Sequence, residues 1–87
     1  MSKMIVNHKV RDFANWKTVF DSMYALRKQF GCTAEHVYRG HENPNEVLIV
    51  THWGNPEQAR KYGQSQELKD GMQNAGVVSA PDIYFAE

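Results

Sequence analysis

The chain has 87 residues, of which 41% are hydrophobic and 23% charged, and its ten basic side chains balance its ten acidic ones. This length favours one domain, residues 1–87, whose core is so small that self-association is expected to help stabilise it. The zero net charge argues against a nucleic-acid or anionic membrane partner, because either would need a basic excess on the protein surface.

The cysteine content and the N-terminal segment favour a cytoplasmic protein. Cys32 is the lone cysteine and can form no internal disulfide, which fits a reducing compartment. The apolar run in residues 1–8 is far shorter than a signal peptide requires. No segment is long enough to span a bilayer, so we expect no membrane partner.

The first third of the chain predicts a strand followed by one long helix. Residues 4–10 alternate around β-branched side chains, as a strand does. Asp12 offers an N-cap and Gly31 a C-terminal stop, with Arg27 in the last turn beside the negative end of the helix dipole. Between the two ends, apolar side chains recur at steps of three and four: Phe13, Trp16, Val19, Phe20, Met23, Leu26 and Phe30.

The remaining chain predicts two strands, an interrupted helical region and a last strand. Residues 33–42 and 46–53 are strand-like, and the turn Asn43-Pro44-Asn45 separates them. Asn55 caps the helical region, and Gln58 stands where it would complete a capping box. Gly63 interrupts this region, Ser65 restarts it and Gly76 ends it. Residues 82–87 form the final strand.

The order β-α-β-β-α-β predicts an α+β, ferredoxin-like fold, a four-stranded antiparallel sheet with both helical regions on one face. Both faces of the sheet carry apolar side chains. In the third strand Val47, Ile49 and Trp53 lie on one face, while Leu48 and Val50 lie on the other. Since helices cover only one face, a second copy of the sheet is the simplest cover for the other, which predicts a homodimer.

Several segments carry a resemblance to a known family: residues 8–17, 43–47, 52–53, 65–68, 72–77 and 81–85. In their order and spacing they resemble the antibiotic-biosynthesis-monooxygenase-like group of the dimeric α+β barrel superfamily. The resemblance implies ferredoxin-like protomers whose sheets face each other. It also implies an activity from a varied set: metal-free and flavin-free oxidation of aromatic polyketides, haem degradation, isomerisation or cyclisation.

The resemblance also implies site residues. Asn7 and Trp53 look like the two positions that line the pocket in haem-degrading members. Met72 stands where those members have the haem-ligating histidine, which argues against haem degradation. His8 is typical of the subgroup and is our candidate catalytic proton acceptor, in a reaction that needs no cofactor.

The chemistry of these residues leaves two interpretations of each. A buried Asn7 amide needs a hydrogen-bond partner that a ligand oxygen can supply, and Trp53 or Trp16 can stack on an aromatic substrate. Tyr38 can donate a hydrogen bond to a phenolate. The alternatives are a strand-edge asparagine, core tryptophans, a tyrosine at a dimer rim, and a His8 imidazole held by a backbone carbonyl.

Two further histidines are candidate metal ligands. If Glu42 pairs with Glu46 across the hairpin, His36 faces His52 directly on one sheet face, where two imidazoles can share a metal ion. The alternative is a pair of partly solvated interface histidines. A one-residue slip in register would separate them.

Three functional hypotheses follow. The first is a cofactor-independent monooxygenase, or a related isomerase or cyclase, in which His8 deprotonates a small aromatic or enolisable substrate held by Asn7 and Trp53. The second is a non-catalytic dimeric module that binds a small hydrophobic ligand, haem or a divalent metal. The third is a dimeric accessory protein without a ligand.

Overall fold

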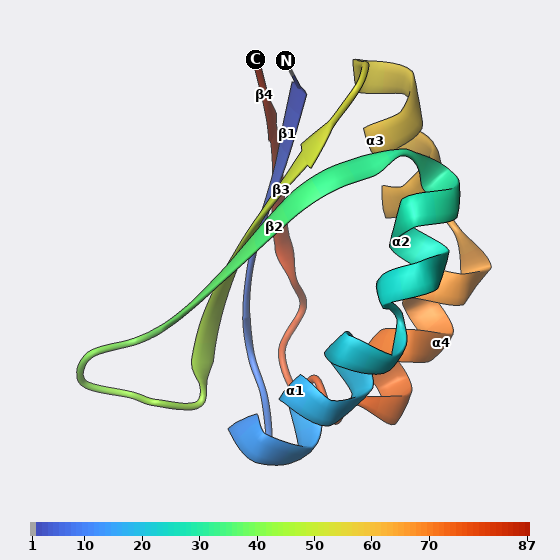
Figure 1. The fold of residues 1–87 in the computed structure, drawn as a ribbon. Helices are drawn as coiled ribbons and strands as arrows, with labels where there is room; N and C mark the ends of the chain where they lie inside the picture. The colour runs from blue at the N-terminus through green and yellow to red at the C-terminus, as the bar shows by residue number, and fades with distance from the viewer. Residues whose placement is uncertain (1) are drawn as a thin grey trace.

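The computed structural model describes residues 2–87, and the order of its elements is the predicted one (Figure 1). The four strands form one antiparallel sheet in the order β2-β3-β1-β4, which is the ferredoxin-like arrangement. Helical pairs replace single helices in both crossovers. The elements are β1 (Ser2–Lys9), α1 (Phe13–Ser22), α2 (Tyr24–Phe30), β2 (Cys32–Arg39), β3 (Glu46–Trp53), α3 (Pro56–Gly63), α4 (Gln66–Asn74) and β4 (Asp82–Ala86).

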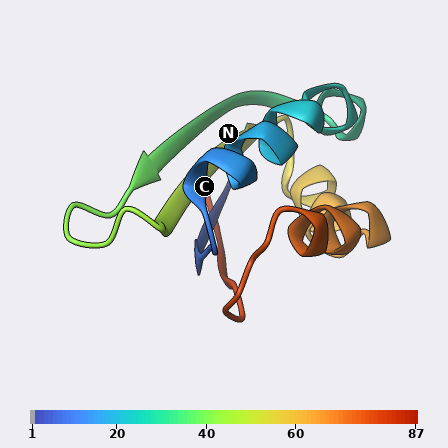
Figure 2. The same ribbon diagram turned by 90° about the horizontal axis from the view of Figure 1, so that it is seen from below.

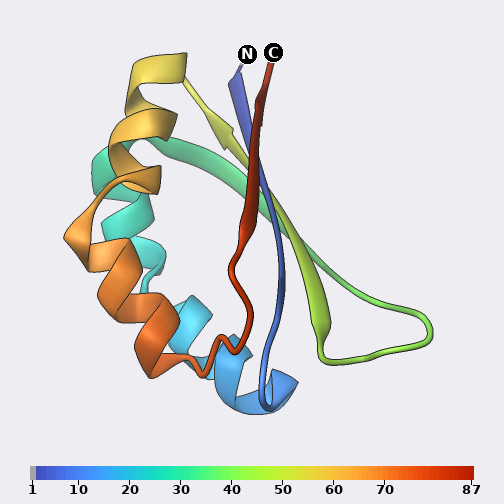
Figure 3. The same cartoon turned by 180° about the vertical axis from the view of Figure 1, so that it is seen from behind.

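All four helices lie on the same side of the sheet (Figure 3). The loop between β2 and β3 extends away from them (Figure 2). The side chains of β1 alternate between the two faces of the sheet. Met4, Val6 and His8 are buried under the helices, while Ile5 and Asn7 are on the outer face, the side of the sheet away from the helices. Within residues 2–87, none of the helices has the length and apolar character needed to cross a membrane.

The prediction of a single helix over residues 13–30 is wrong, because the helix is broken at Met23 into α1 and α2. The Ser22 hydroxyl donates a hydrogen bond to the Val19 carbonyl over 2.6 Å, and the Met23 N–H donates to Phe20 rather than continuing the α-helical pattern. Such local bonds compete with the helix and end it. The predicted ends hold: the Asp12 carboxylate caps α1, and Gly31, with φ of +108°, stops α2.

The second helical region is interrupted where predicted. The α3 helix ends at Gly63, and the Ser65 hydroxyl accepts a hydrogen bond from the Leu68 N–H at the start of α4. Asn55 caps α3 by accepting from the Gln58 N–H. The reciprocal half of the capping box is absent, since the Gln58 Oε1 has no hydrogen-bond partner in the described part of the chain.

The predicted hairpin register is wrong by two residues. β2 ends at Arg39, and the Gly40 N–H donates to the Glu46 carbonyl, so residues 40–45 form a longer loop than expected. His36 is therefore opposite Val50 rather than His52. Because side chains alternate with a period of two, this shift keeps His36 and His52 on the same face, as diagonal neighbours.

Candidate functional site

A cavity of about 50 Å³ lies between the sheet and the helices. Its walls are almost entirely apolar, and both helical pairs contribute to them. The main lining side chains are Met4, Val6, His8, Ile49 and Thr51 from the sheet, and Trp16, Phe20, Met23, Arg27, Tyr62, Leu68 and Met72 from the helices. Small-molecule sites are likewise mostly apolar with a few polar groups, but they usually measure about 300–1,000 Å³, so a substrate could enter here only by displacing lining side chains.

His8 is the polar group that β1 contributes to this cavity. The strand alternation turns it under the helices, where it is 4% exposed. Its ring lies edge-on to Trp16, with 5.9 Å between centroids. Neither ring nitrogen has a hydrogen-bond partner among residues 2–87, so the expected alternative, a backbone carbonyl, is not observed. Burial lowers the pKa of His8, because desolvation penalises the charged imidazolium.

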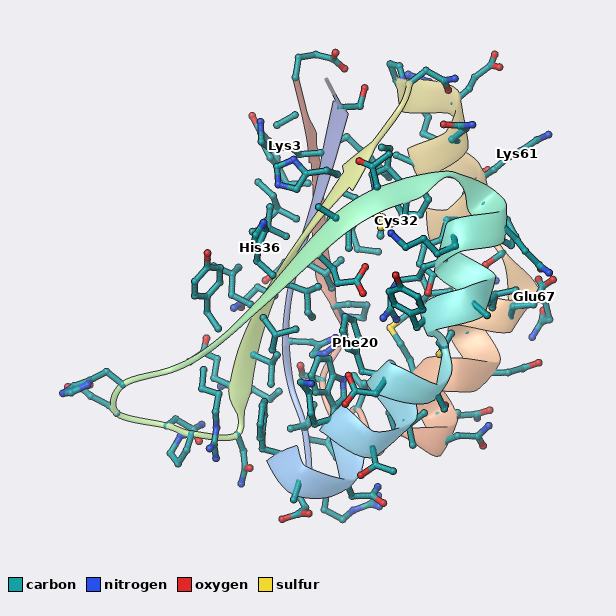
Figure 4. The ribbon with its side chains drawn as sticks, in the orientation of Figure 1. Lys3, Phe20, Cys32, His36, Lys61 and Glu67 are labelled. Carbon is teal, nitrogen blue, oxygen red and sulfur yellow. The ribbon has the colours of Figure 1, made fainter. Side chains whose placement is uncertain are left out.

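Aromatic rings of α1 form one wall of the cavity. Trp16, which is 3% exposed, stacks on Phe20 with 4.9 Å between centroids and an interplanar angle of 18°. Figure 4 places Phe20 in the layer between the helices and the sheet. The structure thus puts the predicted substrate residue Trp16 beside the candidate base His8, and it provides a flat surface against which a planar ligand can stack.

Arg27 is a cavity residue that our sequence reasoning missed. It is 2% exposed, its guanidinium lies 3.8 Å above the Phe20 ring, and its Nη1 donates to the Phe20 carbonyl over 2.8 Å. Its Nη2 is 3.3 Å from the Glu35 carboxylate. A signal was present: Arg27 is four residues after Met23 and seven after Phe20, on the apolar stripe rather than on the solvent side.

Asn7 and Trp53 are not brought together. Trp53 is fully buried under the helices, where its Nε1 donates to the Thr51 hydroxyl over 2.8 Å and its ring contacts Tyr62. Asn7 is on the outer face, and its Nδ2 is 3.4 Å from the Val47 carbonyl. Trp53 pairs with Ser2, an even-numbered position of β1, so the odd-numbered Asn7 must point to the other side.

The outer face carries Tyr38, His36 and His52. Tyr38 is 54% exposed and lies across the sheet from the cavity. The rings of His36 and His52 meet edge to face at 5.4 Å between centroids. Figure 4 shows His36 and Lys3 on the side away from the helices. Across residues 2–87, no group of three or more His, Cys, Asp or Glu side chains is placed to hold a metal ion.

Cys32 is buried and poorly suited to nucleophilic chemistry. Burial and the nearby Glu35 carboxylate raise the pKa of its thiol, which opposes formation of the thiolate. Burial likewise raises the pKa of the Tyr62 phenol, so this group stays protonated beside the cavity.

Comparisons with known proteins agree on the fold. Residues 12–74 match the family model described as antibiotic biosynthesis monooxygenase. A Bordetella bronchiseptica structure assigned to that activity has a TM-score of 0.84 and 15% identity, and the alignment covers 99% of this chain and 94% of that one. SnoaB, a cofactor-independent oxygenase from Streptomyces nogalater, has a TM-score of 0.75 and 14% identity, covering 99% and 92%. A search of curated protein sequences finds no significant match.

The buried His8 predicts a pH dependence of stability. Its pKa is below 6.5 in the folded state, so below about pH 6.5 the unfolded chain takes up a proton that the folded chain does not. The free energy of unfolding should therefore fall with decreasing pH, by up to about 1.4 kcal/mol per pH unit from this group. Urea denaturation of wild type and His8→Leu between pH 7.5 and 5 measures the difference.

The exposed loop residue His41 supplies the control. His41→Gln should keep the wild-type dependence, while His8→Leu should lose the contribution of one proton. Identical pH slopes in wild type and His8→Leu would contradict the assignment.

Proposed function

We propose, because the chain belongs to the antibiotic biosynthesis monooxygenase family, that it is a cofactor-independent oxygenase of a small aromatic or enolisable substrate. The observation that carries the proposal is the buried imidazole of His8, which faces an aromatic-lined cavity with no hydrogen-bond partner on either nitrogen in residues 2–87. A neutral imidazole in that position has a free lone pair to accept a proton.

The reaction starts with proton transfer. His8 accepts a proton from an acidic C–H of the substrate, and the C–H electron pair moves onto a conjugated oxygen. The electron-rich anion then reduces dioxygen directly. For a methylene group the balanced change is conversion of CH₂ and O₂ to C=O and H₂O, so one oxygen atom enters the product and the other leaves as water. Return of the proton to another carbon gives isomerisation at the same site.

The site residues divide between the two sheet faces. We assign Trp16 to stacking against the substrate, because it lines the cavity beside His8. Trp53 lies behind the cavity wall. It is held there by its hydrogen bond to the hydroxyl of Thr51, a residue that lines the cavity. Asn7 and Tyr38 lie on the outer face, so a substrate role for them would require a ligand bound on that side.

The outer face is proposed to pair with a second copy of the chain in a cytoplasmic homodimer. It exposes Leu48, Tyr38 and Tyr84, which are 36%, 54% and 68% exposed. Lone Leu or Tyr side chains are ordinary on a surface, but these lie on three of the four strands, β2, β3 and β4, on one face of the same sheet. Facing sheets would bury them and complete a barrel.

Metal binding is a second candidate function, favoured by the 5.4 Å approach of His36 to His52. Two imidazoles leave a tetrahedral ion half coordinated. A homodimer that joins the outer faces would offer two such pairs, so the metal proposal depends on the dimer.

The base assignment predicts hydrogen exchange in an enolisable ketone. In D₂O, the protein should speed deuterium incorporation at C1 of 2-tetralone, followed by nuclear magnetic resonance. His8→Leu should lower the protein-dependent rate by about 10²- to 10⁴-fold, the usual contribution of a general base.

A second assay with the same variants measures oxygenation directly. Anthrone should be converted to anthraquinone with one dioxygen consumed per molecule, and His41→Gln should retain the rate of wild type. Unchanged exchange in His8→Leu would remove His8 from the mechanism, and exchange without dioxygen uptake would leave an isomerase.

The dimer proposal predicts a mass of twice 10.0 kDa in sedimentation equilibrium. Leu48→Glu puts a charge on the outer face and should give the monomer mass. Tyr24→Glu is the matched control, because Tyr24 is a similarly exposed apolar residue on α2. A monomeric wild type, or a dimer that survives Leu48→Glu, would refute this interface.

The metal proposal predicts that Zn²⁺ binds the dimer, measured by titration calorimetry, and that His36→Asn or His52→Asn abolishes binding. His41→Gln should bind as wild type does. Retained Zn²⁺ binding in both asparagine variants would exclude the pair as ligands.

A further inference from the structure

Unpaired polar atoms are concentrated on the cavity. In the described residues, four buried side-chain nitrogen or oxygen atoms have no hydrogen-bond partner, and three of them belong to cavity-lining side chains: His8 Nδ1, His8 Nε2 and Arg27 Nε. Protein interiors leave very few such atoms unpaired, and those that occur call for an explanation. A ligand with polar groups at two places would pair them.

Nε is the one nitrogen of the Arg27 guanidinium without a hydrogen-bond partner in the described residues, while Nη1 and Nη2 each carry a second N–H and Arg27 also interacts with the Tyr62 phenol. Nη1 donates to the Phe20 carbonyl, Nη2 points to Glu35, and the flat face of the guanidinium rests on the Phe20 ring. These contacts hold the group in a fixed orientation. A fixed, buried N–H is an effective partner for an oxygen atom because its direction is already set, once the neighbouring side chains have made room for the ligand.

We propose that Arg27 is the specificity-determining residue of this site: its Nε–H donates to a carbonyl or hydroxyl oxygen of an uncharged, planar substrate whose acidic C–H faces His8. This proposal rests on the oxygenase function proposed above and adds the substrate class to it. Arg27 would contact the substrate directly, and the conjugated oxygen that receives the electron pair is the one it holds.

Charge balance selects an uncharged substrate. The Glu35 carboxylate lies 3.3 Å from Arg27 and already neutralises it, and Glu35 is only 18% exposed. A substrate carboxylate would therefore introduce a second negative charge into an apolar space, and burying an uncompensated charge is strongly unfavourable. A ketone or phenol pairs the Nε–H without that penalty.

The aromatic rings between the two polar groups favour a planar substrate. Trp16 and Phe20 lie between His8 and Arg27, in successive contacts of 5.9, 4.9 and 3.8 Å. A planar substrate stacked on these rings would present an acidic C–H to His8 and the oxygen conjugated with it, as in an enolisable ketone, to Arg27. Met23, Leu68 and Met72 also line the cavity, and the unbranched methionines can rearrange to admit a ring.

Calorimetric titration with three bicyclic probes tests the proposal. Wild type should bind 2-tetralone at least tenfold more tightly than tetralin, which has no oxygen, and at least tenfold more tightly than the carboxylate 1,2,3,4-tetrahydro-2-naphthoate. Equal binding of 2-tetralone and tetralin would overturn the hydrogen bond. Carboxylate binding as tight as that of the ketone would overturn the uncharged class, and failure of wild type to bind any probe would overturn both.

Two variants test which residues are responsible for these binding preferences. Arg27→Lys keeps a cation beside Glu35 but has no Nε–H, so it should lose the preference for 2-tetralone over tetralin. Glu35→Gln leaves Arg27 without its counter-charge and should bind the carboxylate at least tenfold more tightly. Lys28→Met, an exposed cation one residue away, is the control and should match wild type.

An Arg27→Lys variant that folds, judged by circular dichroism, and keeps the wild-type preference would refute the proposal. If it does not fold, the wild-type affinity ratios still decide. Calorimetry measures binding without turnover. A normal ketone preference combined with no deuterium exchange would therefore fault the base assignment and leave Arg27 as proposed.

Discussion

The site depends on one constraint, which is that strand alternation places an imidazole in an apolar layer. Met4, Val6 and His8 must share a face of β1, and the helices cover that face. Water cannot solvate a charge there, so burial lowers the pKa of His8 and keeps the ring neutral. The neutral ring then has a lone pair available, which the charged ring would lack. The packing that stabilises the fold therefore also sets the protonation state on which the proposed chemistry relies.

The features that the sequence predicted well are those with a simple period. The alternation of Val47, Leu48, Ile49 and Val50 assigned both faces of β3 correctly, because burial on one face ties register to side-chain identity. Trp16 was likewise placed on the buried stripe of α1 by its helical spacing. The caps at Asp12 and Asn55 were predictable because their short side chains accept from a backbone N–H only three residues away.

The features that were missed depend on partners in other helices or strands, or on loop closure. The hairpin register shifted because the bonds of Gly40 and Glu46 close a longer loop, which residue types alone did not reveal. Arg27 was assigned only to the last turn of a helix, where a cation is explained by the negative end of the helix dipole. Its burial requires Glu35 and the Phe20 carbonyl, and only the folded chain brings these three groups together.

Two polar side chains of the cavity, His8 and Arg27, have complementary charge states before and after the proposed proton transfer. Before it, the cavity holds a neutral His8 and an Arg27 that Glu35 neutralises, so the proposed substrate is uncharged. After it, the substrate anion would lie between the His8 imidazolium and the Arg27 Nε–H. The negative charge of the anion and the positive charge of the imidazolium cancel. The low dielectric of the apolar walls strengthens both attractions. The surroundings that disfavour a substrate already charged when it binds would therefore stabilise the anion that forms when His8 takes a proton. The selectivity of binding and the acceleration of proton transfer would then have one electrostatic origin.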